Sequence, residues 1–247
     1  MDSTLVNNQY SLSIRISSDG FSLYVYDEKY QIISHKQEKS GQTDDLEFIH
    51  KMFETNKEIH SAYKNISIIC ESDYHTLIPE IFFKPENRND ILKLHHPSLP
   101  DSARTFHAKQ EQLQSVLIYS LEEKLLKEIY LHFQHIIPES HLVHITRKIA
   151  TERQDKFTLW IRPENIDCIV YNRHKVLLLN KYSYNSPEDI AYHVLNIYQQ
   201  LELNPNEFLL EVFDDGNNQT ESLLRKYIST VIIKPKQSAY EDYQWEV

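Results

Sequence analysis

The sequence predicts an α/β fold made of two related lobes, and two observations predict it. An order of three strands, one helix and one strand occurs twice along the chain. Short stretches of the two copies also match: residues 10–15 (YSLSIR) resemble residues 157–162 (FTLWIR), and Val25-Tyr26 resembles Val170-Tyr171. An internal repeat of this kind reports architecture more strongly than a single motif does. We therefore expect two lobes with the same β-β-β-α-β plan.

In the first lobe, runs of apolar and β-branched residues predict the strands, and Asp19-Gly20 predicts the turn between the first two. Thr43 is expected to cap a helix, because two aspartates and an apolar stripe with helical spacing follow it. The expected strands cover residues 9–17, 20–27, 30–36 and 66–70.

The second lobe repeats this order. Ser186 and Pro187 predict the start of its helix, since a hydroxyl side chain caps the first turn and proline fits the first helical position. A further helix is expected from Thr220 to Tyr227. The expected strands cover residues 157–163, 166–172, 175–182, 208–213 and 230–234.

We expect the first lobe to span residues 1–150, with an insertion at about 74–150, and the second lobe to span residues 151–247 and end in a tail. Within the insertion, residues 120–123 (SLEE) have the pattern of a capping box and predict a helix start. Residues 141–145 (HLVHI) favour a strand. Two more strands are expected at 104–109 and 112–119.

Composition narrows the class of protein. The net charge of −10 over 247 residues argues against a nucleic-acid surface, which needs clustered Lys and Arg. The sequence contains neither a secretory signal pattern nor the roughly 18 consecutive apolar residues of a membrane span. Cys70 and Cys168, the only cysteines, lie in apolar runs and are expected to be buried thiols. These features predict a cytoplasmic protein.

Three stretches carry a resemblance to a known family: residues 12–15 (LSIR), residues 74–83 (YHTLIPEIFF) and the segment 133–144. The chain resembles an uncharacterised family of Bacteroidetes proteins with an actin-like ATPase fold, which is ribonuclease H-like. That fold belongs to the superfamily of actin, sugar kinases and chaperone ATPases. The resemblance covers nearly the whole chain, but its motifs are apolar and turn residues that carry no chemistry.

The resemblance implies where a nucleotide would bind. Active members of the superfamily have an Asp-x-Gly hairpin in each lobe, where backbone amides hold phosphates and the acid organises magnesium. The corresponding turns here are residues 17–20 (SSDG), with the glycine next to the acid, and residues 163–165 (PEN), which contain no glycine. The paired glycines beside adenosine would fall near residues 213–217 (FDDGN), where only one glycine stands. We therefore expect an inherited fold whose ATPase activity is lost.

Glycine usage supports this expectation. Gly20, Gly41 and Gly216 are the only glycines, and a phosphate cradle needs the close backbone approach that glycine allows. Four histidines suggest a metal site at first sight, but no cysteine or carboxylate supports it, and two of them would point to opposite faces of the expected strand 141–145. The four are His132, His135, His141 and His144. The acidic pair Asp214-Asp215 is interpreted as a solvated corner, so no metal site is predicted.

The leading hypothesis is a non-catalytic scaffold for protein–protein interaction that needs no cofactor. The rival is a divergent ATP-binding protein that uses magnesium and four residues, Asp19, Gly20, Asp215 and Gly216. An RNA-associated factor is a third possibility, based on 16 tyrosines and 10 phenylalanines, but the acidic balance opposes it. The tail over residues 237–247 is expected to dock with Trp245 buried, on its own lobe or on a second copy in a homodimer.

Overall fold

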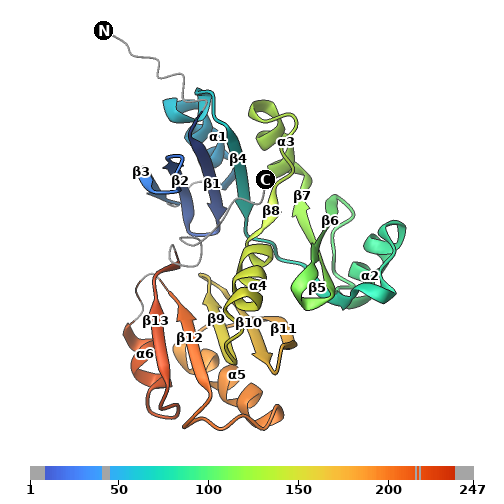
Figure 1. Cartoon of the computed structure of the whole chain (residues 1–247), viewed down its shortest axis with the longest axis vertical. Helices are drawn as coiled ribbons and strands as arrows, with labels where there is room; N and C mark the ends of the chain where they lie inside the picture. The colour runs from blue at the N-terminus through green and yellow to red at the C-terminus, as the bar shows by residue number, and fades with distance from the viewer. Residues whose placement is uncertain (1–8, 41–44, 215, 217, 237–247) are drawn as a thin grey trace. The chain divides into compact units, whose positions relative to one another are not determined.

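The computed structural model describes residues 9–40, 45–214, 216 and 218–236. The described chain forms two compact units. Among the described residues, the first unit comprises 9–40, 45–75, 84–108 and 118–142, and the second comprises 76–83, 109–117, 143–214, 216 and 218–236. Each unit contains one five-stranded mixed sheet (Figure 1).

The sheet of the first unit has the strand order β3-β2-β1-β4-β8. Strand β1 pairs antiparallel with β2 and parallel with β4, while β3 pairs antiparallel with β2 and β8 pairs parallel with β4. Helix α1 packs Phe53 edge-on against Phe21 of β2. These elements are β1 (Ser11–Ser17), β2 (Gly20–Tyr26), β3 (Ile32–Lys39), α1 (Asp45–Thr55), the 3₁₀ helix η1 (Lys57–His60), β4 (Asn65–Cys70) and β8 (Glu139–Ser140).

The sheet of the second unit repeats this plan in the order β11-β10-β9-β12-β13. Its central strand β9 pairs antiparallel with β10 and parallel with β12, as β1 does with β2 and β4. The predicted duplication and fold class are therefore confirmed. The elements are β9 (Lys156–Ile161), β10 (Asn165–Asn172), β11 (Lys175–Ser183), α5 (Pro187–Gln200), β12 (Leu209–Phe213), α6 (Asn218–Leu224) and β13 (Val231–Lys234).

The predicted alignment of residues 10–15 with residues 157–162 is wrong by two residues. Leu12 pairs with Val25 across the first hairpin, and Phe157 pairs with Val170 across the second. Superposing the turns therefore matches Val25 with Val170, as predicted, but matches Leu12 with Phe157. A shift of two residues keeps every side chain on the same face of a strand, so the apolar pattern does not reveal it.

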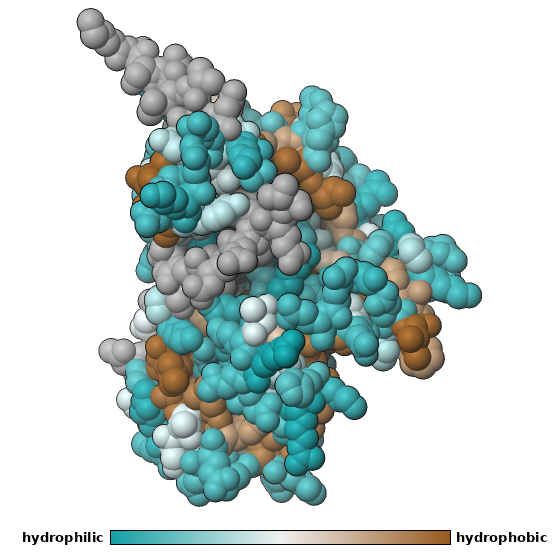
Figure 2. Space-filling model, in the orientation of Figure 1, coloured by the Kyte–Doolittle hydropathy of each residue, from teal (hydrophilic) through white to brown (hydrophobic). Residues whose placement is uncertain are grey.

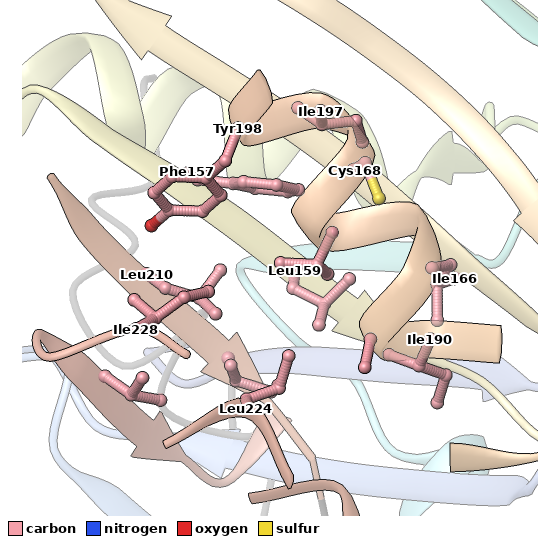
Figure 3. Close-up of a cluster of buried hydrophobic side chains, with 14 of the residues drawn as sticks. Phe157, Leu159, Ile166, Cys168, Ile190, Ile197, Tyr198, Leu210, Leu224 and Ile228 are labelled. Atoms are coloured by element: carbon pink, nitrogen blue, oxygen red, sulfur yellow. The ribbon is translucent and has the colours of Figure 1, made fainter. Parts of the chain in front are cut away.

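The core of the second unit lies between its sheet and α5 and α6. Side chains from β9, β10 and β12 meet those of the helices, and Figure 3 shows the ring of Tyr198 beside that of Phe157. The ring centroids of this pair lie 5.8 Å apart. Helix α5 is held at its start by a complete capping box between Ser186 and Asp189, which confirms the predicted cap. The Thr43 cap and the tail 237–247 lie outside the described residues.

The segment between the repeats corrects two predictions. Residues 141–145 are not a strand but open α4 (His141–Glu152). The capping box at Ser120 is not formed either, because β7 continues to Glu122 and α3 begins only at Glu123. The backbone N–H of Ser120 donates to the carbonyl oxygen of Tyr74 instead.

Three strands of this segment form a small sheet in the order β5-β7-β6. Its elements are β5 (His75–Pro79), the 3₁₀ helices η2 (Glu80–Phe82) and η3 (Pro85–Asn87), α2 (Arg88–His95), β6 (Ala103–Gln110), the 3₁₀ helix η4 (Glu111–Leu113), β7 (Ser115–Glu122) and α3 (Glu123–His132). Among the helices of the described chain, none combines the length and apolar character needed to cross a membrane.

Candidate functional site

The first candidate element is the β1–β2 hairpin, which turns at Ser18 and Asp19. Strand β1 ends at Ser17, which pairs with Gly20 at the start of β2. The Ser17 hydroxyl donates to Asp19 Oδ1 at 2.7 Å, and its oxygen lies 3.1 Å from the Gly20 carbonyl oxygen. The carboxylate of Asp19 thus accepts a hydrogen bond from its own hairpin.

Gly20 is required by the packing of β3. A Cβ atom at this position would lie 2.3 Å from the carbonyl oxygen of Glu38, and the residue has a φ of +157°. The missing side chain therefore makes room for the neighbouring strand. Strand packing therefore explains why residue 20 is glycine, and no role in phosphate binding is needed to explain it.

Replacing Gly20 by alanine is expected to lower the free energy of unfolding by about 2–3 kcal/mol, since a backbone carbonyl cannot move aside as a flexible side chain can. Gly216→Ala is the matched control. Gly216 also has a positive φ, +140°, but its added Cβ would meet nothing within 4 Å, so we expect a cost of about 1 kcal/mol. Urea denaturation measures both changes, and equal losses would contradict the packing role of Gly20.

The side chain of Glu71 accepts a hydrogen bond from a backbone amide of this hairpin. One oxygen of its carboxylate, Oε2, accepts from the Ser18 N–H at 2.9 Å and from the Ser18 hydroxyl at 2.6 Å. Sequence reasoning missed Glu71. The available signal was its place directly after the apolar strand 66–70, because residues at the carboxyl end of β4 reach the hairpin that follows the parallel strand β1.

The second candidate element is the β9–β10 hairpin, and it presents carbonyl groups that are already bonded. The N–H of Arg162 donates to the carbonyl oxygen of Asn165 at 2.8 Å, which closes a turn through Pro163 and Glu164. Tyr184 donates its hydroxyl to the Arg162 carbonyl at 2.6 Å and its N–H to the Glu164 carbonyl at 3.1 Å. Proline supplies no N–H. This turn therefore gives a phosphate few amide donors.

Burial raises the pKa of the Tyr184 hydroxyl, and the nearby Asp214 carboxylate raises it further. A raised pKa keeps the phenol protonated and able to donate to the Arg162 carbonyl. The Arg162 guanidinium itself is buried and paired with Asp167, with Nη2 at 3.0 Å from Oδ1. The side chains of Tyr184 and Arg162 therefore both form hydrogen bonds within the second unit.

The third candidate element follows β12 in the second unit. The N–H of Asp214 donates to the Lys234 carbonyl at 3.0 Å. Two buried aromatic rings lie on the same sheet, Trp160 and Phe213, with centroids 5.5 Å apart. Gly216 is exposed, and Asp215 lies outside the described residues. Of the four residues of the ATP hypothesis, Asp19 and Gly20 adjoin in the first unit, and Gly216 belongs to the second.

The four histidines are dispersed over structural positions. His132 ends α3 and stacks on Phe53 with centroids 4.9 Å apart, and His135 lies beyond the helix. His141 and His144 are buried and lie three residues apart on α4, so they share a helix face and do not point to opposite faces of a strand. Within the residues that the structure describes, no three His, Cys, Asp or Glu side chains are grouped to hold a metal ion.

A charged cluster lies buried on the sheet of the second unit. Glu211 of β12 accepts from Lys156 Nζ at 2.7 Å through Oε2 and from Lys234 Nζ at 2.6 Å through Oε1. Lys156 also donates to Glu152 of α4. Both Lys156 and Glu211 are almost fully buried, with 1% and 3% of their surface exposed. Sequence reasoning missed this cluster, because isolated charges in short apolar strands do not reveal which of them meet.

Comparison with solved structures shows an actin-like ATPase fold. A Bacteroides thetaiotaomicron protein with an actin-like ATPase fold and unknown function matches with a TM-score of 0.88 and 21% identity, over 99% of this chain and 100% of that one. A chain of the PilM–PilN type IV pilus biogenesis complex matches with a TM-score of 0.57 and 9% identity, over 93% and 89%. At these identities the likeness shows the fold alone.

A third structure, the ethanolamine utilization protein EutJ from Carboxydothermus hydrogenoformans, has a TM-score of 0.53 and 7% identity, with 94% of this chain and 86% of that chain covered. No curated protein matches significantly. The model of a family described as "Protein of unknown function (DUF3822)" matches residues 2–231, so that the chain belongs to the DUF3822 family.

Proposed function

We propose that this protein is a non-catalytic, cytoplasmic scaffold that uses its actin-like fold for protein–protein interaction and needs no cofactor. The observation that carries the proposal is the turn η2, which holds two large apolar side chains in solvent. Ile81 is 84% exposed and Phe82 is 71% exposed. Large apolar groups that gather on a surface mark interaction sites more often than singly scattered ones do.

The turn is held in place, which favours a role for its two side chains. The N–H of Glu80 donates to the Gln114 carbonyl at 2.9 Å, and the N–H of Phe83 closes the turn onto the Glu80 carbonyl at 3.0 Å. The carboxylate of Glu80 also pairs with Lys109 at 2.8 Å. A turn fixed in this way presents Ile81 and Phe82 with little entropy left to lose on binding. Figure 2 shows that the surface around such apolar areas is largely hydrophilic.

The hairpins support the non-catalytic part of the proposal. In the first unit the Ser18 amide is bonded to Glu71, and in the second unit the turn contains Pro163 and its carbonyls face Tyr184. Phosphate binding in this fold relies on free backbone amides at both hairpins, as the resemblance to active members implies. Each hairpin lacks one such donor, because the Ser18 N–H is bonded to Glu71 and Pro163 has no N–H.

An affinity pull-down from native lysate tests the interaction. The wild-type chain is expected to retain a specific partner, and the double variant Ile81→Ser/Phe82→Ser is expected to lose at least about 90% of it, as for a hot-spot pair. Leu131→Ser is the matched control, because Leu131 is also strongly exposed, at 69%, but lies on α3. Light scattering shows whether the partner is a second copy. Equal retention by the double variant and the control would contradict the proposal.

The ATP-binding alternative is tested by calorimetric titration with Mg-ATP. The scaffold proposal expects no saturable heat for the wild type. Micromolar binding that is lost in Asp19→Asn and in Asp215→Ala would overturn the proposal and support a divergent nucleotide site. Asp101→Asn is the matched control, because the Asp101 side chain is 94% exposed and lies outside both hairpins.

A further inference from the structure

A pocket of about 380 Å³ lies wholly within the second unit, beside the start of strand β13. Its lining residues come from the segment that leads into β9, from the loop before β12 and from the start of β13. Strand β13 forms the edge of the sheet next to β12 (Figure 1). The volume is near the lower end of the range for ligand pockets, roughly 300–1,000 Å³, so it suits one long side chain better than a large cofactor.

The pocket combines apolar and acidic lining residues. Leu209 is buried, Phe208 is partly buried, and Ile232 is 44% exposed. Asp155 and Glu207 add two exposed carboxylates, and the described lining residues include no lysine or arginine. An arginine side chain matches both features, because it has an apolar stem, a flat guanidinium group that packs on aromatic rings, and five N–H donors for carboxylates.

Hydrogen bonds hold the acidic residues of the pocket in place. The Asn204 carbonyl accepts from the N–H of Glu207 at 3.1 Å and from that of Phe208 at 2.8 Å. Asp155 is fixed separately, since its Oδ1 accepts from the N–H of Arg173 at 2.9 Å. A pocket whose backbone is fixed in this way loses little entropy when a ligand binds.

Strand β13 offers its outer edge to an added strand. Within the described chain, β13 pairs with β12 alone. The carbonyl groups of Thr230 and Lys234 accept from backbone N–H groups on the side of β12. Because alternate residues of a strand bond to the same neighbour, the backbone groups of Val231 and Ile233 point to the outer edge. A strand added there would lie about 4.8 Å away, and its side chains on the same face as Ile232 would reach the pocket.

We propose that the pocket and the edge of β13 form a docking site for an extended basic segment of a partner protein, which adds to β13 and places one arginine side chain beside Asp155 and Glu207. Backbone hydrogen bonds to the edge supply affinity, and the pocket selects the cation. The chain's net charge of −10 favours the encounter with a basic partner. The site does not depend on the interaction role of Ile81 and Phe82, which lie on a different element, so either proposal can fail without the other.

Nuclear magnetic resonance of the full-length chain tests the proposal, with the peptide acetyl-Thr-Val-Arg-Val-Thr-amide as the probe. When the peptide is extended, its arginine lies on one face and its two valines on the other. The wild type is expected to show saturable shifts at the amides of residues 207–209 and 231–233, and slower hydrogen exchange at Val231 and Ile233. The same peptide with citrulline in place of arginine keeps the shape without the charge, and it should bind at least about tenfold more weakly.

Two variants locate the charge that the peptide recognises. Glu207→Gln removes one carboxylate of the pocket and keeps the backbone contact with Asn204. It is expected to weaken binding of the arginine peptide about five- to tenfold and to leave binding of the citrulline peptide unchanged. Glu188→Gln is the matched control, because Glu188 is an exposed carboxylate of α5 that does not line the pocket. Its affinity for the arginine peptide should stay within about twofold of the wild type.

Four outcomes would overturn the inference. Equal affinity of the wild type for the two peptides would mean that the pocket does not recognise the cation. Equal weakening by Glu207→Gln and Glu188→Gln would indicate general attraction to an acidic chain. Binding without slower exchange at Val231 and Ile233 would mean that the peptide does not add to β13. The absence of any saturable shift at millimolar arginine peptide would contradict the docking site itself.

Discussion

Replacing Phe157 by alanine is expected to lower the free energy of unfolding of the second unit by about 3–5 kcal/mol. Phe157, the second residue of β9, is fully buried and faces the helices. Its ring lies against Tyr198 of α5, and β12 packs Leu210 into the same cluster (Figure 3). Because the surrounding side chains come from several elements, they cannot all close the space that a truncated ring leaves.

Hydrogen exchange of β9, β10 and β12 locates the loss in the second unit, and urea denaturation gives its size. Phe157→Leu keeps most of the apolar volume and should cost less than about 1.5 kcal/mol. Tyr227→Ala removes a ring that is 55% exposed and should stay within about 0.5 kcal/mol of the wild type. A loss for Phe157→Ala no greater than that for Tyr227→Ala would show that the cluster in Figure 3 does not stabilise this unit.

The elements with complete local signals could be predicted from the sequence. Ser186 and Asp189 form the capping box that the motif indicates, and the helix continues from Pro187 as expected. The hairpin forms where Asp19-Gly20 indicates a turn, although the two loop residues are Ser18 and Asp19 and Gly20 already pairs with Ser17. In these places local preference and tertiary packing agree, so a short window is sufficient.

The segment around α4 shows where a short window fails. Residues 141–145 alone fit either a strand or a helix, but the buried positions Leu142, Ile145 and Ile149 have helical spacing once the window reaches residue 152. Ser120 fails for a different reason. Its S-x-x-E pattern is genuine, but the pairing of its N–H with Tyr74 extends β7 and outweighs the cap. Tertiary hydrogen bonds of this kind leave no local trace.

For the candidate site, only the missing glycines could be predicted. The sequence alone indicates where glycines are missing, at residues 163–165 and beside Gly216. It does not indicate what occupies the turns, because Glu71 is 53 residues from Ser18 and Tyr184 is 22 residues from Arg162. Such contacts depend on parallel pairing and on the ends of strands, which a single sequence specifies weakly. Only the three-dimensional structure therefore shows that Glu71 bonds to the first hairpin and Tyr184 to the second.

Replacing Glu211 by glutamine is expected to lower the free energy of unfolding of the second unit by about 3 kcal/mol, the low end for a broken buried ion pair. Glu211 accepts hydrogen bonds from both Lys234 Nζ and Lys156 Nζ, and Lys156 Nζ also donates to Glu152. Glutamine removes the negative charge while Lys156 stays buried. The remaining pair with Glu152 limits the loss.

The pH dependence provides an independent test of this cluster. Burial alone would raise the pKa of Glu211, but the hydrogen bonds from Lys156 and Lys234 outweigh burial and hold the pKa below its usual value. A carboxyl group with a lowered folded-state pKa stabilises the protein above its unfolded-state pKa of about 4.3, and this contribution disappears as the pH falls through the folded-state value. The difference between wild type and Glu211→Gln should therefore be full at neutral pH and shrink below about pH 4.3.

Two further variants separate a buried pair from ordinary surface charge. Glu221→Gln removes an exposed partner of Arg225 on the same unit and should cost less than about 0.5 kcal/mol. The double variant Lys156→Met/Glu211→Leu removes both buried charges and should be more stable than Glu211→Gln, since no desolvated ammonium group remains without its carboxylate. Urea denaturation at neutral and acidic pH measures all three. If Glu211→Gln were no more costly than Glu221→Gln, or if its deficit were the same at every pH, the buried cluster would not stabilise the second unit through its charges.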